Sequence, residues 1–221
     1  KVGDTLRETF GGRLKFFIVG GAALNDEVSD FLMKAGFPLT VGYGMTECAP
    51  LISYIEPKRY RHGSVGKIMS MIQEVRIAKA DHVEEDAEGH EVGEIQVRGE
   101  NVCKGYYKNP EATTALFTAD GWLRAGDLGY YDKDEYLYIS GRIKAMILTS
   151  NGENVYPEAI EEKYNIHPYV AECVVVQRGE RLVAVVYPDY AVLEKEQKEP
   201  KAALEEVRKQ INTLLNPYQQ I

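Results

Sequence analysis

The segment between residues 14 and 41 constrains the fold of this chain more than any other part of the sequence. The apolar run Leu14–Val19 predicts a strand that ends at Gly20. Apolar residues at helical spacing then predict a helix, and they are Val28, Phe31, Leu32 and Ala35. Gly36 stops this helix, and Leu39–Val41 begins the next strand. The order strand, helix, strand is that of a parallel sheet and predicts an α/β fold.

Both predicted strands end in glycine-containing turns, at the sheet edge where ligands of parallel sheets bind. The first turn has small residues that let the backbone contact a flat ring, and they are Gly20, Gly21, Ala22 and Ala23. In the second turn, Gly42–Glu47, the ring of Tyr43 offers a stacking face and the hydroxyl of Thr46 suits a phosphate. Glu47 can hold Mg²⁺ jointly with that phosphate, because Mg²⁺ binds few protein carboxylates. The alternatives are a packing role for Tyr43 and a helix-start carboxylate at Glu47.

A second set of candidate residues lies between residues 121 and 142. Asp127 stands between two glycines before an apolar strand, and its two oxygens can accept hydrogen bonds from adjacent ribose hydroxyls. Residues 128–140 predict two short strands joined by a polar turn, and this hairpin would return Arg142 toward Asp127. The guanidinium of Arg142 can reach a ribose oxygen or a phosphate. The alternatives are a turn-capping aspartate and a surface arginine in a weak ion pair.

The remaining patterns predict two further pieces of structure. Residues 63–107 contain short alternating runs broken by glycines and one charged loop, Asp81–Glu91, which indicates antiparallel β-structure that we interpret as a small distorted barrel. Tyr106 and Tyr107 at its end are expected to pack. After Arg142 the sequence predicts a strand over 145–148, a turn, a helix from Pro157, a hairpin over 174–186 and a last amphipathic helix. These elements predict a small α+β domain.

Several sequence motifs, taken together, resemble a known family. They are Gly20–Leu24, Gly42–Glu47, Asp120–Gly129, Gly141–Lys144 and Asn151–Glu161. Their wording, order and spacing resemble the adenylate-forming acyl-CoA synthetases, the superfamily that also holds luciferases and peptide-synthetase adenylation domains. The resemblance implies an α/β part followed by a small β-barrel-like subdomain and a small α+β C-terminal domain. The expected boundaries are 1–55, 56–140, a hinge at 141–145, and 146–221.

The resemblance also assigns roles to residues. It implies that Tyr43 stacks on adenine, Thr46 meets the α-phosphate, Glu47 meets Mg²⁺, Asp127 holds the ribose with help from Arg142, and Lys144 marks the hinge. Further nucleotide contacts are implied for Gly21, Ala22, Ala23, Gly44 and Ile139. Contacts with coenzyme A are implied for Ser150, Asn151 and Gly152, where the alternative is an ordinary strand-to-helix turn. Two residues depart from the family pattern: Ala23 stands where a proline is frequent, and Ala145 where an acid is common.

Composition excludes several classes of binding partner and structural site. A net charge of −8 over 221 residues argues against a broad nucleic-acid surface. No apolar run approaches the roughly 20 residues of a transmembrane helix. The cysteines Cys48, Cys103 and Cys173 form no C-x-x-C pair, which argues against a disulfide framework or zinc site and favours a reducing cytoplasm. The four histidines are interpreted as solvated loop residues, and they are His62, His82, His90 and His167.

The resemblance implies that this chain is part of an ATP-dependent ligase that activates a carboxylic acid, preferably a long-chain fatty acid, as an acyl-adenylate and passes it to coenzyme A. The family's Ser/Thr/Gly-rich phosphate loop does not occur in these residues, and Leu215–Ile221 resembles the approach to a final motif whose lysine is not reached. The chain is therefore expected to be a fragment with little activity of its own. Two alternatives stay open: an adenylation domain that loads a carrier protein, and a non-catalytic nucleotide-binding module.

Overall fold

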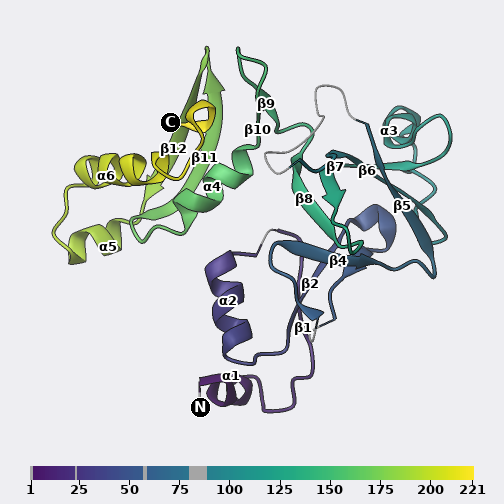
Figure 1. The fold of residues 1–221 in the computed structure, drawn as a ribbon, viewed down its shortest axis with the longest axis horizontal. Coiled ribbons are helices and arrows are strands. Elements are labelled where there is room, and N and C mark those ends of the chain that lie inside the picture. The colour runs from purple at the N-terminus through teal and green to yellow at the C-terminus, as the bar shows by residue number, and fades with distance from the viewer. Residues whose placement is uncertain (1, 23, 57–58, 80–88) are drawn as a thin grey trace. The chain divides into compact units, whose positions relative to one another are not determined.

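The computed structural model describes residues 2–22, 24–56, 59–79 and 89–221, and it divides into two compact units, Lys1–Ser140 and Gly141–Ile221 (Figure 1). The N-terminal unit begins with α1 (Val2–Thr9), β1 (Phe17–Val19), α2 (Asp26–Lys34) and β2 (Leu39–Gly44). β1 and β2 are parallel, and α2 lies beside them (Figure 1). The predicted strand-helix-strand unit is thus confirmed, although its first strand starts at Phe17 rather than Leu14.

Local sequence explains both ends of α2. The side chain of Asn25 caps the helix by accepting a hydrogen bond from the amide of Val28 at 2.9 Å. Gly36 follows the helix with φ of +70°, a left-handed conformation that glycine adopts without strain. The chain then enters β2, four of whose six residues are buried.

A single eight-stranded sheet organises the N-terminal unit. Its order is β1-β2-β3-β4-β8-β7-β6-β5, and all the strand pairs after β1–β2 with a defined register are antiparallel. The added strands are β3 (Leu51–Tyr54), β4 (Ser64–Ile68), β5 (Gln73–Ala78), β6 (Gly93–Gly99), β7 (Leu123–Tyr131) and β8 (Leu137–Arg142). The short helices η1 (Thr46–Cys48) and α3 (Pro110–Leu116) complete the unit.

The antiparallel structure expected over residues 63–107 is present, but the barrel-like subdomain is not confirmed. In the part of the chain that the structure describes, the sheet is open, with β1 at one edge and β5 at the other. Its strands continue the sheet of β1 and β2 through β3, so the α/β part and the antiparallel part share one hydrogen-bonded surface. The core of this unit is formed by Cys48, Ile52, Ile95, Val97, Leu116, Leu123, Ala125 and Leu137.

The C-terminal unit has the predicted α+β composition. A two-stranded pair, β9 (Ile147–Leu148) and β10 (Asn154–Val155), precedes α4 (Pro157–Asn165), and the long hairpin of β11 (Val170–Arg178) and β12 (Arg181–Pro188) follows. The chain ends with α5 (Tyr190–Lys195), α6 (Pro200–Asn212) and η3 (Pro217–Gln219). Its separate core is formed by Val155, Ile160, Tyr164, Val170, Cys173, Val175, Val207, Ile211 and Leu215.

One predicted element of this unit is shorter than expected. The sequence predicts a strand over 145–148, whereas only Ile147–Leu148 is extended. The amides of Ala145 and Met146 both donate to the carbonyl oxygen of Arg142, at 3.1 and 3.0 Å. These bonds turn the backbone immediately after β8, so the strand can begin only at Ile147.

Candidate functional site

The turn after β2 is shaped by close contacts between backbones. A Cβ atom on Gly20 would lie 2.8 Å from the carbonyl oxygen of Gly42, and one on Gly44 would lie 1.8 Å from that of Pro50. The pairing of β2 with β3 shifts register between Tyr43 and Gly44, and the amide of Met45 donates to Pro50 at 2.8 Å. Glycine is therefore required at positions 20 and 44 for steric reasons that follow directly from the sheet.

The first predicted turn is only partly described. Gly21 and Ala22 are exposed after the end of β1, and Gly21 has φ of +92°. Ala23 lies outside the described residues, as does His82 in the charged loop. Exposed backbone of this kind can lie against a planar ligand, as the sequence predicts for this turn.

The clearest feature of the site is a contact between two predicted nucleotide-binding residues. The hydroxyl of Tyr43 in β2 donates to Oδ2 of Asp127 in β7 at 2.6 Å. Asp127 is only 5% exposed, whereas Tyr43 is half-buried beside the core of the unit. The two residues are 84 positions apart, so the sheet brings them together. The contact holds a carboxylate and an aromatic ring at one place, which is the pairing expected for a nucleoside.

Glu47 has a hydrogen-bond partner that the sequence did not indicate. Its Oε1 accepts from the hydroxyl of Tyr106 at 2.5 Å, and its backbone carbonyl accepts from the amide of Cys103 at 2.8 Å. Tyr106 is 41% exposed and Tyr107 is 88% exposed, so the expected packing role of this pair is wrong. No local pattern points to Tyr106, because the contact spans 59 residues. Thr46, next to Glu47, is exposed as a phosphate-binding hydroxyl should be.

The residues around Glu47 limit the kind of metal site that it can form. Among the described residues, no three His, Cys, Asp or Glu side chains gather where they could hold a metal ion. Glu47 alone fits a site in which nucleotide phosphates and water supply the other oxygens, which is how proteins commonly bind Mg²⁺ with a nucleotide. Burial is the main cause that raises the pKa of the neighbouring Cys48 thiol to about 11.

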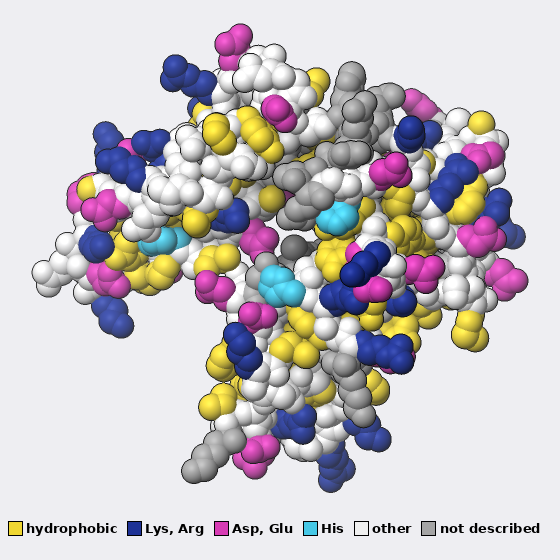
Figure 2. All heavy atoms as spheres, in the orientation of Figure 1, with side chains coloured by type: hydrophobic (Ala, Val, Ile, Leu, Met, Phe, Trp, Pro, Cys, Tyr) yellow, Lys and Arg dark blue, Asp and Glu magenta, His cyan; other side chains and the backbone are white. Residues whose placement is uncertain are grey.

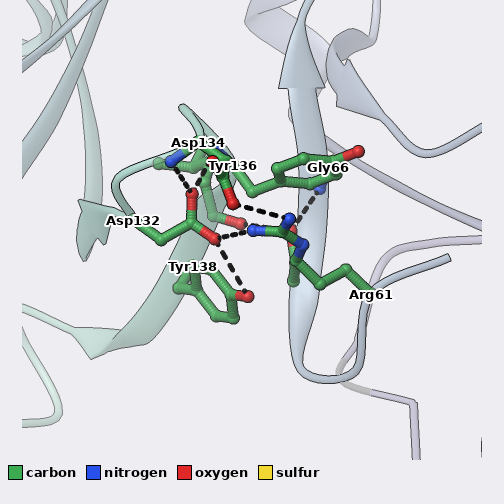
Figure 3. Close-up of polar contacts among 8 residues, drawn as sticks. Arg61, Gly66, Asp132, Asp134, Tyr136 and Tyr138 are labelled. Carbon is green, nitrogen blue, oxygen red and sulfur yellow. Dashed lines mark hydrogen bonds and ion pairs between the residues drawn. The ribbon is translucent and has the colours of Figure 1, made fainter. Parts of the chain in front are cut away.

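The hairpin that carries Asp127 is fastened at its turn. Figure 3 shows Arg61, which precedes β4, reaching the carboxylates of Asp132 and Asp134. The other oxygen of Asp132 accepts from the amides of Asp134 and Tyr136 at 2.9 Å each, and the Arg61 guanidinium lies 4.1 Å from the centre of the Tyr136 ring. Burial pushes the pKa of Asp132 up, but the Tyr136 amide and Arg61 outweigh it and hold the pKa below its ordinary value.

Ile139 lies on the strand that follows this turn, in β8. It is half-buried and packs against the core of the N-terminal unit, as does Tyr43. An apolar side chain in this setting can contact the flat face of a base, which agrees with its predicted place among the nucleotide contacts.

The other predicted site residues lie in the C-terminal unit. Arg142 ends β8, and Lys144 is exposed in the turn that follows. Ser150, Asn151 and Gly152 are exposed between β9 and β10, in a turn closed by the Gly152 amide donating to the carbonyl of Thr149 at 3.0 Å. The approach of Arg142 to Asp127 and the coenzyme A contacts of this turn stay predictions.

The distribution of charged side chains and the length of the helices bear on possible partners. Lysine and arginine side chains are mixed with aspartate and glutamate over the face shown in Figure 2. Within the described residues, no helix is both long and apolar enough to cross a membrane.

Family comparisons define the class of protein. The model of the AMP-binding enzymes matches residues 3–107, and the model of the AMP-binding enzyme C-terminal domain matches residues 144–221. The chain therefore belongs to the AMP-binding enzyme family of adenylate-forming ligases, as the motifs indicated.

Individual relatives refine this picture. Long-chain-fatty-acid–CoA ligase 4 of Saccharomyces cerevisiae is 33% identical over 192 residues, covering 86% of this chain and 27% of the yeast protein. The adenylation domain of a carboxylic acid reductase from Segniliparus rugosus, solved with AMP and a co-purified carboxylic acid, is 25% identical with a TM-score of 0.81, covering 98% of this chain and 34% of its own. An o-succinylbenzoate coenzyme A synthetase from Bacillus subtilis, solved with ATP and a magnesium ion, is 29% identical with a TM-score of 0.73, covering 98% and 45%. The chain thus spans between about a quarter and a half of these proteins.

Proposed function

We propose that this chain forms the adenylate-binding and hinge region of an ATP-dependent acyl-CoA ligase. The 2.6 Å contact between Tyr43 and Asp127 carries the proposal, because it joins a stacking ring and a diol-binding carboxylate from distant strands. The two family matches, over residues 3–107 and 144–221, support it. Of the similar proteins, the carboxylic acid reductase domain was solved with AMP and a carboxylic acid, and the o-succinylbenzoate coenzyme A synthetase with ATP and magnesium.

The proposed reaction has two steps. A carboxylate attacks the α-phosphorus of ATP, giving an acyl-adenylate and releasing pyrophosphate. The thiol of coenzyme A then attacks the acyl carbon, and AMP leaves. Magnesium held through Glu47 would offset negative charge on the phosphates when bound.

The residues of this chain supply binding and orientation for both steps. Asp127 accepts hydrogen bonds from the ribose hydroxyls, and the Tyr43 hydroxyl orients its carboxylate. The ring of Tyr43 and the backbone at Gly21, Ala22 and Gly44 face the adenine, and Thr46 donates to the α-phosphate. Ala23 and Ile139 complete the base contacts. Because the sheet fixes Tyr43, Gly44 and Asp127, the nucleotide is held in place before the acid arrives.

The C-terminal unit is proposed to serve the second step. Residues 141–145 form the hinge, with the turn at Arg142–Ala145 as the point of rotation and Lys144 within it. The exposed turn of Ser150, Asn151 and Gly152 would then contact the pantetheine arm of coenzyme A. Within the N-terminal unit, 1–55 bind the nucleotide base and 56–140 supply the ribose-binding hairpin.

A long-chain fatty acid is the proposed acyl group, because the yeast relative that covers 86% of the chain is named for that substrate. The main alternative is an adenylation domain that passes its acyl group to a carrier protein, and the likeness to a carboxylic acid reductase domain favours it. The three cysteines are free, which supports a reducing, cytoplasmic location.

The test of the nucleotide site is AMP binding measured by calorimetry. Asp127→Asn should weaken AMP binding by about 1.5–3 kcal/mol, or roughly 10- to 150-fold in Kd, because hydrogen bonds to a charged acceptor are lost. Glu135→Gln is the matched control, since it makes the same acid-to-amide change at an exposed position of the same hairpin, outside the contacts with Arg61. Equal AMP affinity of Asp127→Asn and the unaltered protein would refute the assignment.

The reaction itself is tested by thioester formation. The whole ligase that contains this chain is given ATP, Mg²⁺ and coenzyme A with palmitate, octanoate or benzoate, and AMP release is measured. Palmitate is expected to give the highest kcat/KM. Release of AMP without dependence on coenzyme A would favour the carrier-protein alternative.

A further inference from the structure

We propose that Tyr106 is a positioning residue for Glu47, and that its hydroxyl fixes the carboxylate in the orientation that binds a nucleotide-bound Mg²⁺. The inference rests on the proposed function, since it concerns the metal side of the same site. It adds a residue that the motifs of the chain do not mark.

Three hydrogen bonds fasten residues 101–106 to η1. The amide side chain of Asn101 donates to the carbonyl oxygen of Cys48 at 2.8 Å, and the backbone amide of Cys103 donates to that of Glu47 at 2.8 Å. The hydroxyl of Tyr106 then reaches Oε1 of Glu47 at 2.5 Å. The first two bonds fix the backbone of η1, and the third fixes the one side chain there that can bind a cation.

The Tyr106 end of the contact is itself held in place. Its backbone amide donates to Oγ1 of Thr113 in α3 at 2.9 Å, and that hydroxyl donates to the carbonyl of Asn109 at 2.8 Å. A Cβ on Gly105 would lie 2.4 Å from Cγ2 of Thr113, so only glycine permits this approach. Because the Tyr106 ring is 41% exposed, core packing does not account for its position.

The chemistry of a carboxylate allows both contacts at once. Each oxygen has two lone-pair directions, so accepting one hydrogen bond leaves Glu47 able to coordinate a cation. The orientation of Glu47 matters because the described residues form no group of three or more His, Cys, Asp or Glu side chains that could hold the metal without the nucleotide. The phenol of Tyr106 is protonated at neutral pH, so its hydroxyl is the donor in the contact with Glu47.

The test measures metal binding without turnover. Mn²⁺ replaces Mg²⁺, and its Kd in the presence of ATP is measured by electron paramagnetic resonance. Tyr106→Phe should weaken Mn²⁺ binding about tenfold, the scale on which outer partners of a metal ligand act. Tyr107→Phe, the same change on the neighbouring exposed ring, should leave it unaltered, and Glu47→Gln should weaken it most. AMP binding, which needs no metal, should be unchanged in Tyr106→Phe.

A second variant guards against a change in folding. Thr113→Val keeps the Tyr106 hydroxyl but removes the acceptor of its amide, and it should weaken Mn²⁺ binding less than Tyr106→Phe does. Unchanged Mn²⁺ affinity in Tyr106→Phe, with Glu47→Gln weakened, overturns the positioning role. Unchanged affinity in Glu47→Gln, or no Mn²⁺ binding by the unaltered protein, overturns the metal site and this proposal together. Normal Mn²⁺ binding without any thioester formation overturns only the proposed reaction.

Discussion

At the scale of single residues, the candidate site depends on hydroxyl groups that orient carboxylates. Tyr43 donates to Asp127 and Tyr106 donates to Glu47, at 2.6 and 2.5 Å. In both pairs the donor and acceptor come from segments far apart in the sequence. We therefore propose two uses for Tyr43: its hydroxyl orients Asp127, and its ring stacks on the base.

These two uses can be separated by mutation. Tyr43→Phe keeps the ring and removes the hydroxyl, so AMP binding should weaken by about 0.5–1.5 kcal/mol, roughly 2- to 10-fold in Kd. Tyr43→Ala should weaken it further because the stacking face is also lost. Calorimetry with AMP measures both, and Tyr54→Phe on the neighbouring strand β3 is the control. If Tyr43→Phe binds AMP as tightly as the unaltered protein, the hydroxyl has no orienting role.

The sequence predicted single residues well where the signal was local. The glycine-containing turns after the first two strands were predicted from local patterns, and the structure gives Gly20 and Gly44 a steric reason. The nucleotide roles of Tyr43 and Asp127 were predicted from residue chemistry and from the resemblance, whereas the hydrogen bond between their side chains was not predicted. Tyr106 was misjudged because its partner lies 59 residues away, beyond any local pattern.

At the scale of elements, the β7–β8 hairpin is central, because Asp127 lies on β7 and the chain leaves the N-terminal unit along β8. Its turn is held by Arg61 through Asp132 and Asp134, as Figure 3 shows. The side chain of Asp132 is 15% exposed, so this ion pair is better shielded than an ordinary surface pair.

Replacing Asp132 should therefore destabilise the N-terminal unit. Asp132→Asn is expected to lower the free energy of unfolding by about 1–2 kcal/mol, because charge-assisted hydrogen bonds are weakened. Since the folded-state pKa of Asp132 lies below its ordinary value of 3.8, its contribution is present above that pH and is lost as the pH falls below it.

Urea unfolding at pH 7 and at pH 3 measures this effect. The difference between Asp132→Asn and the unaltered protein should shrink at the lower pH. Lys133→Gln changes the charge of an exposed residue in the same turn and serves as the control. A difference that grows toward pH 3 would contradict the assigned direction.

The types of the elements were more predictable than the way they pack against one another. The helical period was read from Val28 and Phe31, yet these side chains are 47% and 54% exposed while Ser29 is fully buried. Which face of α2 is covered depends on its neighbours and not on its own periodicity. The barrel was wrongly expected for the same reason. A sheet closes only if its edge strands, here β1 and β5, meet, and the alternation within each strand carries no information about that.

At the scale of the whole molecule, the chain has two separate hydrophobic cores. The first is built from residues between 43 and 139, and the second from residues between 147 and 221. Each core includes strands and at least one helix of its own unit. This division is what a chain with a hinge between two parts requires.

Separate cores predict that residues 141–221 fold alone. The isolated segment should unfold cooperatively with heat and give dispersed amide resonances. Ile160→Ala should lower its stability by about 2–5 kcal/mol, because a fully buried side chain is removed. Ile166→Ala, at a position that is 40% exposed, is the matched control. Broad, undispersed spectra from the unaltered segment would show that the second core needs the first.

The joining of Tyr43 to Asp127 also has a consequence for the order of folding. The two residues sit on β2 and β7, and three other strands lie between these in the sheet. A nascent chain that has folded only as far as β2 therefore contains the Tyr43 ring but not yet the Asp127 carboxylate. Nucleotide affinity would therefore arise late in folding, when strands far apart in the sequence pair. A bound nucleotide would then stabilise the whole sheet against unfolding and not only one loop.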